Sequence, residues 1–360
     1  MTRRAPLLIT PGIGHADGVS RVAGLLAGAM AADHAPLEVW TLRSPGRTAP
    51  APRPGLHVVD AGGSPLRLLA SGTGEILAER PAIVVAHLHL LPVAMPALAA
   101  GRRVAVYLHG VEAWRRQPWW RLRLLKATPI LLANSSWTAR RFAAAHPELS
   151  ARAVAVCPPA IADPAPPALR SPFVEREPIV VIVGRMWAEE RYKGHDLLLD
   201  VWPEVRRRVP GARLVVIGDG DDRGRLEARA RAEGLGESVR FTGLLTDAER
   251  DDEYRSARVF AMPSTGEGFG LVYLEAMRHG LPCVAGSGAP EEIVVDGVTG
   301  CIVRDGGRED LAGALAGLLA DPDRCREMGD AGAARVASHF TVRGFEDCVR
   351  RALSVDASPC

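Results

Sequence analysis

The segment STGEGFGLVYLEAM, residues 264–277, places two glutamates where an apolar helix begins. Glu267 lies among glycines ahead of the helix, and Glu275 follows inside it, a little over two turns later at about 3.6 residues per turn. The two carboxylates therefore cannot form one close acid–base pair and must have separate roles. The glycines around Phe269 leave backbone amides accessible, and the N-terminus of a helix attracts anions. The segment predicts a site for an anionic ligand at the start of this helix.

Two cationic residues follow another predicted strand, in VGRMWAEERYKGHDLLL at 183–199. Arg185 comes directly after the strand and Lys193 directly before a helical run, so both side chains are expected at the carboxyl edge of a sheet. Arginine binds phosphate oxygens with two parallel hydrogen bonds, and lysine supplies a compact charge. With the amides of residues 269–272 they predict a diphosphate site, although this segment alone would also fit a solvated charged loop.

Other turns after predicted strands are weaker signals. VVIGDGDD at 215–222 is a strand with a Gly-Asp-Gly turn, and FTGLLTD at 241–247 is a strand-to-loop transition that could line a base pocket. Near the N-terminus, the glycine-rich segment at 12–24 follows the first strand and opens the first helix. A phosphate-approaching loop has this placement, and so does a plain strand-to-helix turn.

The elements that would position these residues form two successive sets. Short apolar runs alternate with helical patterns from residue 7 to 135, and the same rhythm restarts at residue 179. Such runs predict parallel sheets covered on both faces, with ligands at the carboxyl ends of the strands. We therefore expect an α/β protein with two doubly wound Rossmann-like domains that face a central cleft. The expected divisions are an N-terminal domain at 1–162, a Pro-rich linker at 163–173, a C-terminal domain at 174–339, and a last helix and tail at 340–360 that cross back to the N-terminal domain.

Composition excludes several classes of protein. The 360 residues include 47% hydrophobic and 24% charged residues, which is typical of a globular protein and not of a disordered chain. A net charge of +2 gives no argument for nucleic-acid binding. The six scattered cysteines form no CxxC pair and no zinc-site spacing, and Pro11 and Gly12 interrupt the first apolar run. We expect a protein of a reducing, cytoplasmic compartment with no bound metal.

With this order of elements, the chain resembles the retaining glycosyltransferases of family 4, which have the GT-B fold. The resemblance rests on GR…RYKGHDLLL, VVIGDGD, RFTGLLTD and STGEGFGLVYLEAMRHGLPCVAGSGAPEEIV, which contains the family's Glu-x7-Glu motif. It is strong over about residues 183–303 and looser upstream. It implies a nucleoside-diphosphate sugar donor, held mainly by the second domain, and no cofactor beyond that substrate.

The resemblance also implies roles for particular residues. Arg185 and Lys193 would neutralise the diphosphate, Glu267 would hold donor hexose hydroxyls, and His109 would contact the donor sugar from the first domain; these four are the expected catalytic residues. Glu275 would accept hydrogen bonds from the ribose. The full expected donor-binding set is Gly18, Leu245, Asp247, Gly268, Phe269, Gly270, Leu271, Val272 and Glu275.

Within the first domain, His109 has competitors. It ends the predicted strand in VYLHGVEAW, residues 106–114, while His87 and His89 follow the preceding strand. A lone histidine is more often a structural hydrogen-bonding group than a functional one. Only the strand-end position and the resemblance favour His109.

The segment at 113–129, AWRRQPWWRLRLLKATP, interleaves three tryptophans with five cationic residues. Such a segment can lie in the headgroup region of an anionic membrane, which would suit a lipid-linked acceptor at the inner face of the membrane. The alternative is an ordinary amphipathic helix whose tryptophans pack inward.

The resemblance implies transfer of a hexose to a glycan or lipid-linked acceptor, with retention of anomeric configuration, in cell-surface polysaccharide or glycolipid synthesis. Two alternatives remain open at this point: a GT-B nucleotide-sugar epimerase, and a non-catalytic scaffold subunit of a glycan-assembly complex. The sugar, the nucleotide and the acceptor cannot be named from the sequence.

Overall fold

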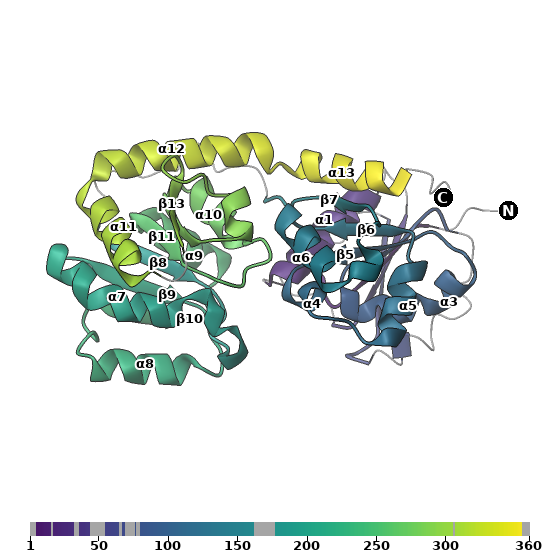
Figure 1. Ribbon diagram of the computed structural model, residues 1–360, viewed down its shortest axis with the longest axis horizontal. Coiled ribbons are helices and arrows are strands. Elements are labelled where there is room, and N and C mark those ends of the chain that lie inside the picture. The colour runs from purple at the N-terminus through teal and green to yellow at the C-terminus, as the bar shows by residue number, and fades with distance from the viewer. Residues whose placement is uncertain are drawn as a thin grey trace. The chain divides into compact units, whose positions relative to one another are not determined.

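The computed structural model describes residues 5–15, 17–31, 36–43, 55–64, 67–68, 76, 80–161, 177–304 and 307–354. The chain divides into two compact units, Met1–Ala160 with Val342–Cys360, and Ile161–Thr341. The linker predicted at 163–173 lies outside the described residues, as do residues 44–54. Figure 1 shows the helices and strands of both units.

The first unit is built on a seven-stranded parallel sheet with the order β3-β2-β1-β4-β5-β6-β7. All five residues of the interior strand Val104–Leu108 are buried, which explains why such strands appear in the sequence as continuous apolar runs. The strands are β1 (Leu7–Thr10), β2 (Leu37–Thr41), β3 (Leu56–Asp60), β4 (Ile83–Val85), β5 (Val104–Leu108), β6 (Ile130–Ala133) and β7 (Val154–Val156). The helices are α1 (Gly18–Met30), η1 (Leu88–Ala94), α3 (Met95–Ala99), α4 (Val111–Trp114), α5 (Trp119–Ala127), α6 (Ser136–Ala145), η2 (Pro147–Leu149) and α13 (Val342–Ser354).

The last helix of the described chain, α13, belongs to this first unit. It packs along α1, and its apolar face buries Phe345 and Val349. Two hydrogen bonds fix it further: Arg350 Nε donates to the Ala29 carbonyl at 3.0 Å, and Cys348 Sγ donates to the Val156 carbonyl at 3.3 Å. The first unit is therefore completed by residues from both ends of the sequence.

The second unit is built on a six-stranded parallel sheet with the order β10-β9-β8-β11-β12-β13. Helices cover both of its faces, with α7 and α8 on one side in Figure 1 and α10 and α12 on the other. The strands are β8 (Ile179–Val183), β9 (Arg213–Ile217), β10 (Val239–Gly243), β11 (Val259–Met262), β12 (Cys283–Gly286) and β13 (Gly300–Val303). The helices are η5 (Ala188–Lys193), α7 (His195–Arg208), α8 (Arg223–Ala232), α9 (Asp247–Ser256), α10 (Leu271–Arg278), η6 (Ala289–Glu292), α11 (Arg308–Ala320) and α12 (Pro322–His339).

The order of strands matters for function because β8 lies between β9 and β11. After β8 the chain adds β9 and β10 on one side of this strand, and it then returns to add β11 on the other side. In doubly wound sheets, the loops at the carboxyl ends of two such strands separate and form a crevice that binds ligands. The segments after β8 and β11 are those that contain Arg185, Lys193 and Glu267.

Candidate active site

The second unit brings Lys193 and Glu267 into contact, although they are 74 residues apart in the sequence. Lys193 Nζ lies 3.2 Å from Glu267 Oε2, and both side chains are largely buried. The backbone holds the two loops together, because the Thr265 amide donates to the Tyr192 carbonyl at 2.9 Å. Gly194 has φ +91°, and a β-carbon there would lie 2.9 Å from the Pro263 carbonyl oxygen, so a side chain at 194 would push the loops apart.

The charge of Lys193 is fixed by this environment. Burial by itself would lower the pKa of Lys193, but the neighbouring Glu267, Tyr192 and Glu190 outweigh burial, and the pKa lies above its ordinary value. The ammonium group is therefore charged at neutral pH.

Arg185 follows β8 directly and extends into solvent. Its guanidinium group forms a two-point ion pair with Glu190, with Nε 3.1 Å from Oε2 and Nη2 in contact with Oε1. Burial raises the pKa of the Tyr192 hydroxyl, and the neighbouring charges that also act on this pKa are Lys193, Glu190, Glu267 and Arg185. The four charges therefore surround one place at the carboxyl edge of the sheet.

Helix α10 begins beside Glu267. Its N-cap is Gly270, with φ +99° and no room for a β-carbon because the Tyr273 ring would lie 2.4 Å away. The amides of Leu271 and Val272 are in the first turn, where a helix offers no acceptor of its own. Phe269 packs its ring into the core against Phe340, at 6.0 Å between centroids, so only its backbone is available to a ligand.

Glu275 is buried inside α10 and faces α9. Its Oε2 accepts a hydrogen bond from Tyr254 at 3.2 Å and lies 3.4 Å from Arg250 Nε. Arg250 also pairs with Asp247, at 2.8 Å. Arg250 thus connects two residues expected to bind the nucleoside, Glu275 and Asp247, while the third, Leu245, packs partly against the core. Glu267 and Glu275 have separate surroundings, in keeping with their separation in the sequence.

In the first unit, His109 lies at the end of β5 and is held from several sides. Its Nε2 is 2.6 Å from the Ala86 carbonyl oxygen, and its backbone N–H donates to Glu112 Oε1 at 2.6 Å. Asn134 Nδ2 donates to the His109 carbonyl. A carbonyl can only accept, so Nε2 carries the ring proton and Nδ1 is the free acceptor in the neutral ring.

His87 is the competing histidine, and the structure gives it a local role. Its ring stacks on His109 at 5.5 Å between centroids, and its side chain caps η1 by accepting the His89 amide at 3.2 Å. Burial, then the neighbouring His109, lowers the pKa of His87 to about 4. His87 therefore stays neutral at neutral pH, and its acceptance of the His89 amide explains it as the capping residue of η1.

Gly18 is the first residue of α1 and is exposed. The preceding residue, Asp17, caps this helix by accepting hydrogen bonds from the Ser20 amide at 3.0 Å and the Ser20 hydroxyl at 2.9 Å. The glycine-rich segment leads from β1 into α1, and Gly18 at the first helical position is exposed.

Three side chains at these places were missed by the sequence reading: Glu190, Arg250 and Glu112. Each contacts one predicted residue: Glu190 pairs with Arg185, Arg250 with Glu275, and Glu112 accepts from the backbone of His109. Their sequence signals were weak, since each is one charged residue among many, and only tertiary contact distinguishes them.

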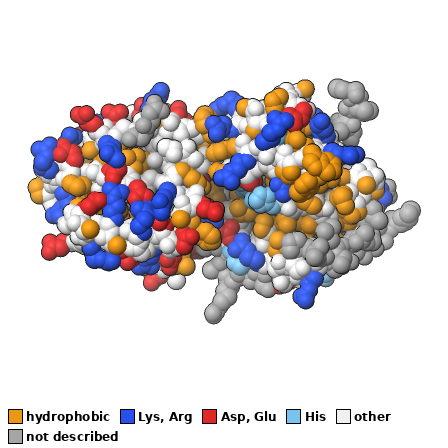
Figure 2. All heavy atoms as spheres, turned by 60° about the horizontal axis from the view of Figure 1, so that its bottom comes forward, with side chains coloured by type: hydrophobic (Ala, Val, Ile, Leu, Met, Phe, Trp, Pro, Cys, Tyr) orange, Lys and Arg blue, Asp and Glu red, His pale blue; other side chains and the backbone are white. Residues whose placement is uncertain are grey.

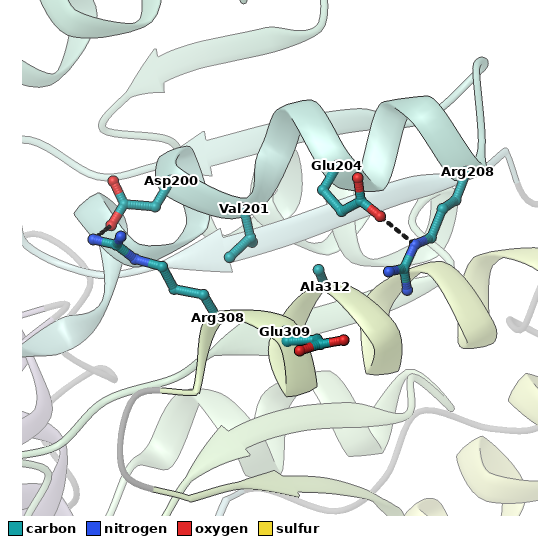
Figure 3. A pocket seen from close by; sticks show the side chains of 7 residues that line it. All are labelled: Asp200, Val201, Glu204, Arg208, Arg308, Glu309 and Ala312. Carbon is teal, nitrogen blue, oxygen red and sulfur yellow. Dashed lines mark hydrogen bonds and ion pairs between the residues drawn. The ribbon is translucent and has the colours of Figure 1, made fainter.

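A separate cavity of about 300 Å³ lies between α7 and α11 (Figure 3). Asp200 of α7 pairs with Arg308 of α11 across the opening at 2.8 Å, while Glu204 pairs with Arg208 within α7 at 2.6 Å. It shares no residue with the expected donor site, and we interpret it as a groove between packed helices. No group of three metal-ligating side chains occurs in the ranges that the structure describes.

The tryptophan segment of the first unit does not pack inward as a whole. Trp119 is 71% exposed and Trp120 40%, and α5 buries only Leu125 fully. Met95 of α3, which contacts α5, is also exposed, and the exposed cations of the segment are Arg115, Arg116, Arg123 and Lys126. We call these seven residues the tryptophan surface. Figure 2 shows hydrophobic side chains gathered in a patch on the first unit, with Lys and Arg side chains beside it. Over the described part of the chain, every helix is too short or too polar to cross a bilayer.

Solved structures share this fold over almost the whole chain. The structure of Anabaena HepE with UDP and glucose matches with a TM-score of 0.76 at 20% identity, covering 98% of this chain and 100% of that one. Sucrose-phosphate synthase from Thermosynechococcus elongatus matches with a TM-score of 0.77 at 21% identity, covering 97% and 98%. Two parallel-sheet α/β units of this kind define the GT-B class of glycosyltransferases, as expected from the sequence.

Sequence comparison gives the family. The model for "Glycosyltransferase Family 4" matches residues 16–163 and that for "Glycosyl transferases group 1" matches residues 177–321. A GDP-mannose-dependent monoacylated alpha-(1-6)-phosphatidylinositol monomannoside mannosyltransferase of Corynebacterium glutamicum is 30% identical over 304 residues, 77% of each chain. A GDP-mannose-dependent alpha-(1-6)-phosphatidylinositol monomannoside mannosyltransferase of Mycolicibacterium smegmatis is 35% identical over 254 residues, and the match spans 65% of each protein. The chain belongs to glycosyltransferase family 4.

Proposed function

We propose that the protein transfers a hexose from a nucleoside-diphosphate sugar to a lipid-linked or glycan acceptor, with retention of anomeric configuration. The observation that carries this proposal is the contact of Lys193 with Glu267 at the start of α10, beside Arg185. It gathers two cations, a helix N-terminus and a carboxylate at one edge of the sheet. The cations and the helix N-terminus can bind a diphosphate, and the carboxylate can accept a hydrogen bond from a sugar hydroxyl.

In this proposal the second unit stabilises the leaving group. Arg185, Lys193 and the first amides of α10 receive the charge that develops on the diphosphate as the bond to the anomeric carbon breaks. Preorganised donors of this kind are each worth about 3–4 kcal/mol in comparable oxyanion sites. The acceptor hydroxyl attacks from the face that the diphosphate leaves, and its proton passes to the departing phosphate oxygen. We expect these steps to proceed without a metal ion, so that a chelator leaves turnover unchanged.

The other expected residues complete the donor site. Glu267 would hold hexose hydroxyls, while Glu275, kept in place by Arg250 and Tyr254, would accept from the ribose. We propose that His109 of the first unit contacts the donor sugar through its free Nδ1, with Ala86 and Glu112 keeping the ring and backbone in position.

The names of the relatives suggest the first substrates to test. Both mannosyltransferases are described as GDP-mannose-dependent and as acting on phosphatidylinositol monomannoside or its monoacylated form. We propose GDP-mannose as donor and a phosphatidylinositol-based glycolipid as acceptor. The exposed tryptophan surface supports such an acceptor, because aromatic and cationic side chains together favour an anionic membrane interface. The reaction would then occur at the cytoplasmic face of a membrane.

The experiment is a two-stage assay on the full chain. Thermal unfolding with a panel of sugar nucleotides first identifies the donor, because a ligand that binds the folded state raises the midpoint. Release of nucleoside diphosphate is then measured with and without glycolipid acceptor, and the anomeric configuration of the product is read by NMR. Release that requires acceptor, with a retained product, supports the proposal. Release or isomerisation without acceptor would identify an epimerase instead, and binding without turnover would identify a scaffold.

A further inference from the structure

The charges around the expected diphosphate site cancel in the structure. Arg185 is paired with Glu190 through two contacts, and Lys193 is paired with Glu267 at 3.2 Å. Two cations and two carboxylates leave no net positive charge at the place where a ligand with two or three negative charges is expected to bind. At least one of the pairs must therefore change when such a ligand arrives.

Of the two carboxylates, Glu190 is the one whose ion pair we expect to break. Its side chain is 17% exposed, while that of its partner Arg185 is 59% exposed. The charge of Glu190 also helps to raise the pKa of Lys193, so this one carboxylate lies near both cations. A diphosphate that approached Arg185 would meet the negative charge of Glu190 at the same edge of the guanidinium group.

The geometry of the Arg185–Glu190 pair is the geometry that a phosphate would adopt. A guanidinium group binds carboxylate and phosphate alike with two parallel N–H···O bonds, and it cannot offer the same two N–H groups to both. The carboxylate thus occupies the Nε–Nη2 edge of Arg185, one of the two edges at which a guanidinium group can bind a phosphate with paired hydrogen bonds. This is competition for one binding edge rather than a remote effect.

The backbone around Glu190 is anchored on both sides. The Ala188 amide donates to Asp221 Oδ1 at 2.8 Å, and Arg191 pairs with Asp222 at 2.9 Å. Glu190 itself has φ −113° and ψ 24°, outside the helical values of its neighbours in η5. Rotation of the Glu190 side chain, without movement of η5, is therefore the simplest way to free Arg185.

We propose that Glu190 is a carboxylate latch that occupies Arg185 in the absence of donor and is displaced by the diphosphate of the nucleotide. This inference rests on the proposed function for the chemical class of the ligand. The latch sets a threshold for binding, because a ligand must provide enough negative charge at Arg185 to replace the carboxylate. A nucleoside without phosphates would gain nothing from its removal.

The test compares Glu190→Gln with wild type by calorimetric titration with GDP and with UDP, at low and at high salt. Glutamine keeps the size of the side chain and removes its charge. We expect the variant to bind the nucleoside diphosphate about two- to fivefold more tightly at low salt, as fits the loss of a partly exposed ion pair, and less so at high salt. Glu189→Gln is the matched control: it removes the same charge from the adjacent exposed residue of η5 and should leave affinity unchanged.

A double-mutant cycle separates the latch from a general charge effect. In an Arg185→Gln background, Glu190→Gln should give little further gain, because the guanidinium group that it occupies is gone. Equal gains in both backgrounds would overturn the latch. Weaker binding by Glu190→Gln would also overturn it, since Glu190 would then be orienting Arg185 for the ligand.

The outcomes also separate this inference from the proposed function. If wild type binds a nucleoside diphosphate and Glu190→Gln binds it no more tightly, the latch is wrong and the transferase proposal stands. If neither wild type nor Glu190→Gln binds GDP, UDP or inorganic pyrophosphate, and the variant unfolds at the same temperature as wild type, the latch and the transferase proposal are both wrong.

Discussion

Lys193 shows what a single residue contributes here. Lysine occurs at only two positions, 126 and 193, among the 44 Lys and Arg residues of the chain. At 193 the side chain is largely buried, and its Cδ would lie 3.4 Å from a β-carbon placed at Gly184. Lysine places a compact charge on a flexible stem at this largely buried position, and a planar guanidinium group does not reproduce it.

We predict that Lys193→Ala lowers kcat about 100- to 1,000-fold with a much smaller loss of donor affinity, because Lys193 acts mainly on charge that develops in the transition state. Lys193→Arg should lose turnover too, because a guanidinium group spreads its charge over a plane and does not reproduce the compact ammonium charge. Steady-state kinetics with donor titration measures both constants, and the unfolding midpoint checks that the variants fold. Equal losses in kcat and in donor affinity would contradict a transition-state role.

His195, the first residue of α7, predicts a pH dependence of stability. Burial, then the neighbouring charge of Lys193, lowers the pKa of His195 to about 4. The unfolded chain has the ordinary value near 6.5, so between these values the unfolded state binds more protons and stability falls as the pH falls. This contribution is complete above about pH 6.5 and is lost toward pH 4.

Lowering the pH from 7.5 to 5 should reduce the free energy of unfolding by about 2 kcal/mol through His195, at 1.36 kcal/mol per pKa unit. His195→Leu should remove that part of the acid sensitivity. Urea unfolding at the two pH values, followed for both proteins, measures the difference. Identical acid sensitivity of wild type and variant would show that His195 is not buried in its neutral form.

At the scale of elements, the start of α10 is fixed by backbone shape as much as by side chains. Gly270 takes a left-handed conformation directly before the amides of Leu271 and Val272. The position of these amides relative to Glu267 and Lys193 depends on that turn.

We predict that Gly270→Ala destabilises the protein by about 1–3 kcal/mol and abolishes nucleotide binding, because a β-carbon at φ +99° would collide with Tyr273. Gly224→Ala in α8 is the matched control. A β-carbon at 224 meets no atom within 4 Å, and alanine in a helix should stabilise the protein by about 0.5–1 kcal/mol. Thermal unfolding with and without nucleotide distinguishes the two. Normal nucleotide binding by Gly270→Ala would mean that the turn does not position the site.

At the scale of the whole molecule, the two units have different surfaces. The first unit carries the tryptophan surface, whereas the second carries the paired charges of the expected donor site and the ion pairs of α7, α8 and α11. In the proposed function, the first unit would meet the acceptor and the second unit would hold the donor.

We predict that Trp119→Ser/Trp120→Ser weakens binding to vesicles that contain anionic lipid by about tenfold or more, because two exposed aromatic side chains no longer enter the interface. Trp187→Ser, which changes an exposed tryptophan of the second unit, should leave vesicle binding unchanged. Sedimentation with anionic and with zwitterionic vesicles measures the effect. Undiminished binding of the double variant would rule out the tryptophan surface as the contact.

The sequence by itself determined the two parallel-sheet units and the family. Buried parallel strands require continuous apolar runs, as in Val104–Leu108, and glycine spacing with Glu-x7-Glu is a local pattern. The sequence did not determine the exact ends of the helices, such as Arg223–Ala232 for α8, because local patterns do not fix where a helix stops.

Tertiary structure alone decided which charges meet. Lys193 and Glu267 lie on loops after β8 and β11, and nothing in their sequence spacing fixes a 3.2 Å contact. The pairing of Arg185 with Glu190 and of Arg250 with Glu275 depends on rotamers and packing that no local pattern encodes. The sequence sets the residue types along each strand and helix, but the distances between side chains follow from how the sheet brings its loops together.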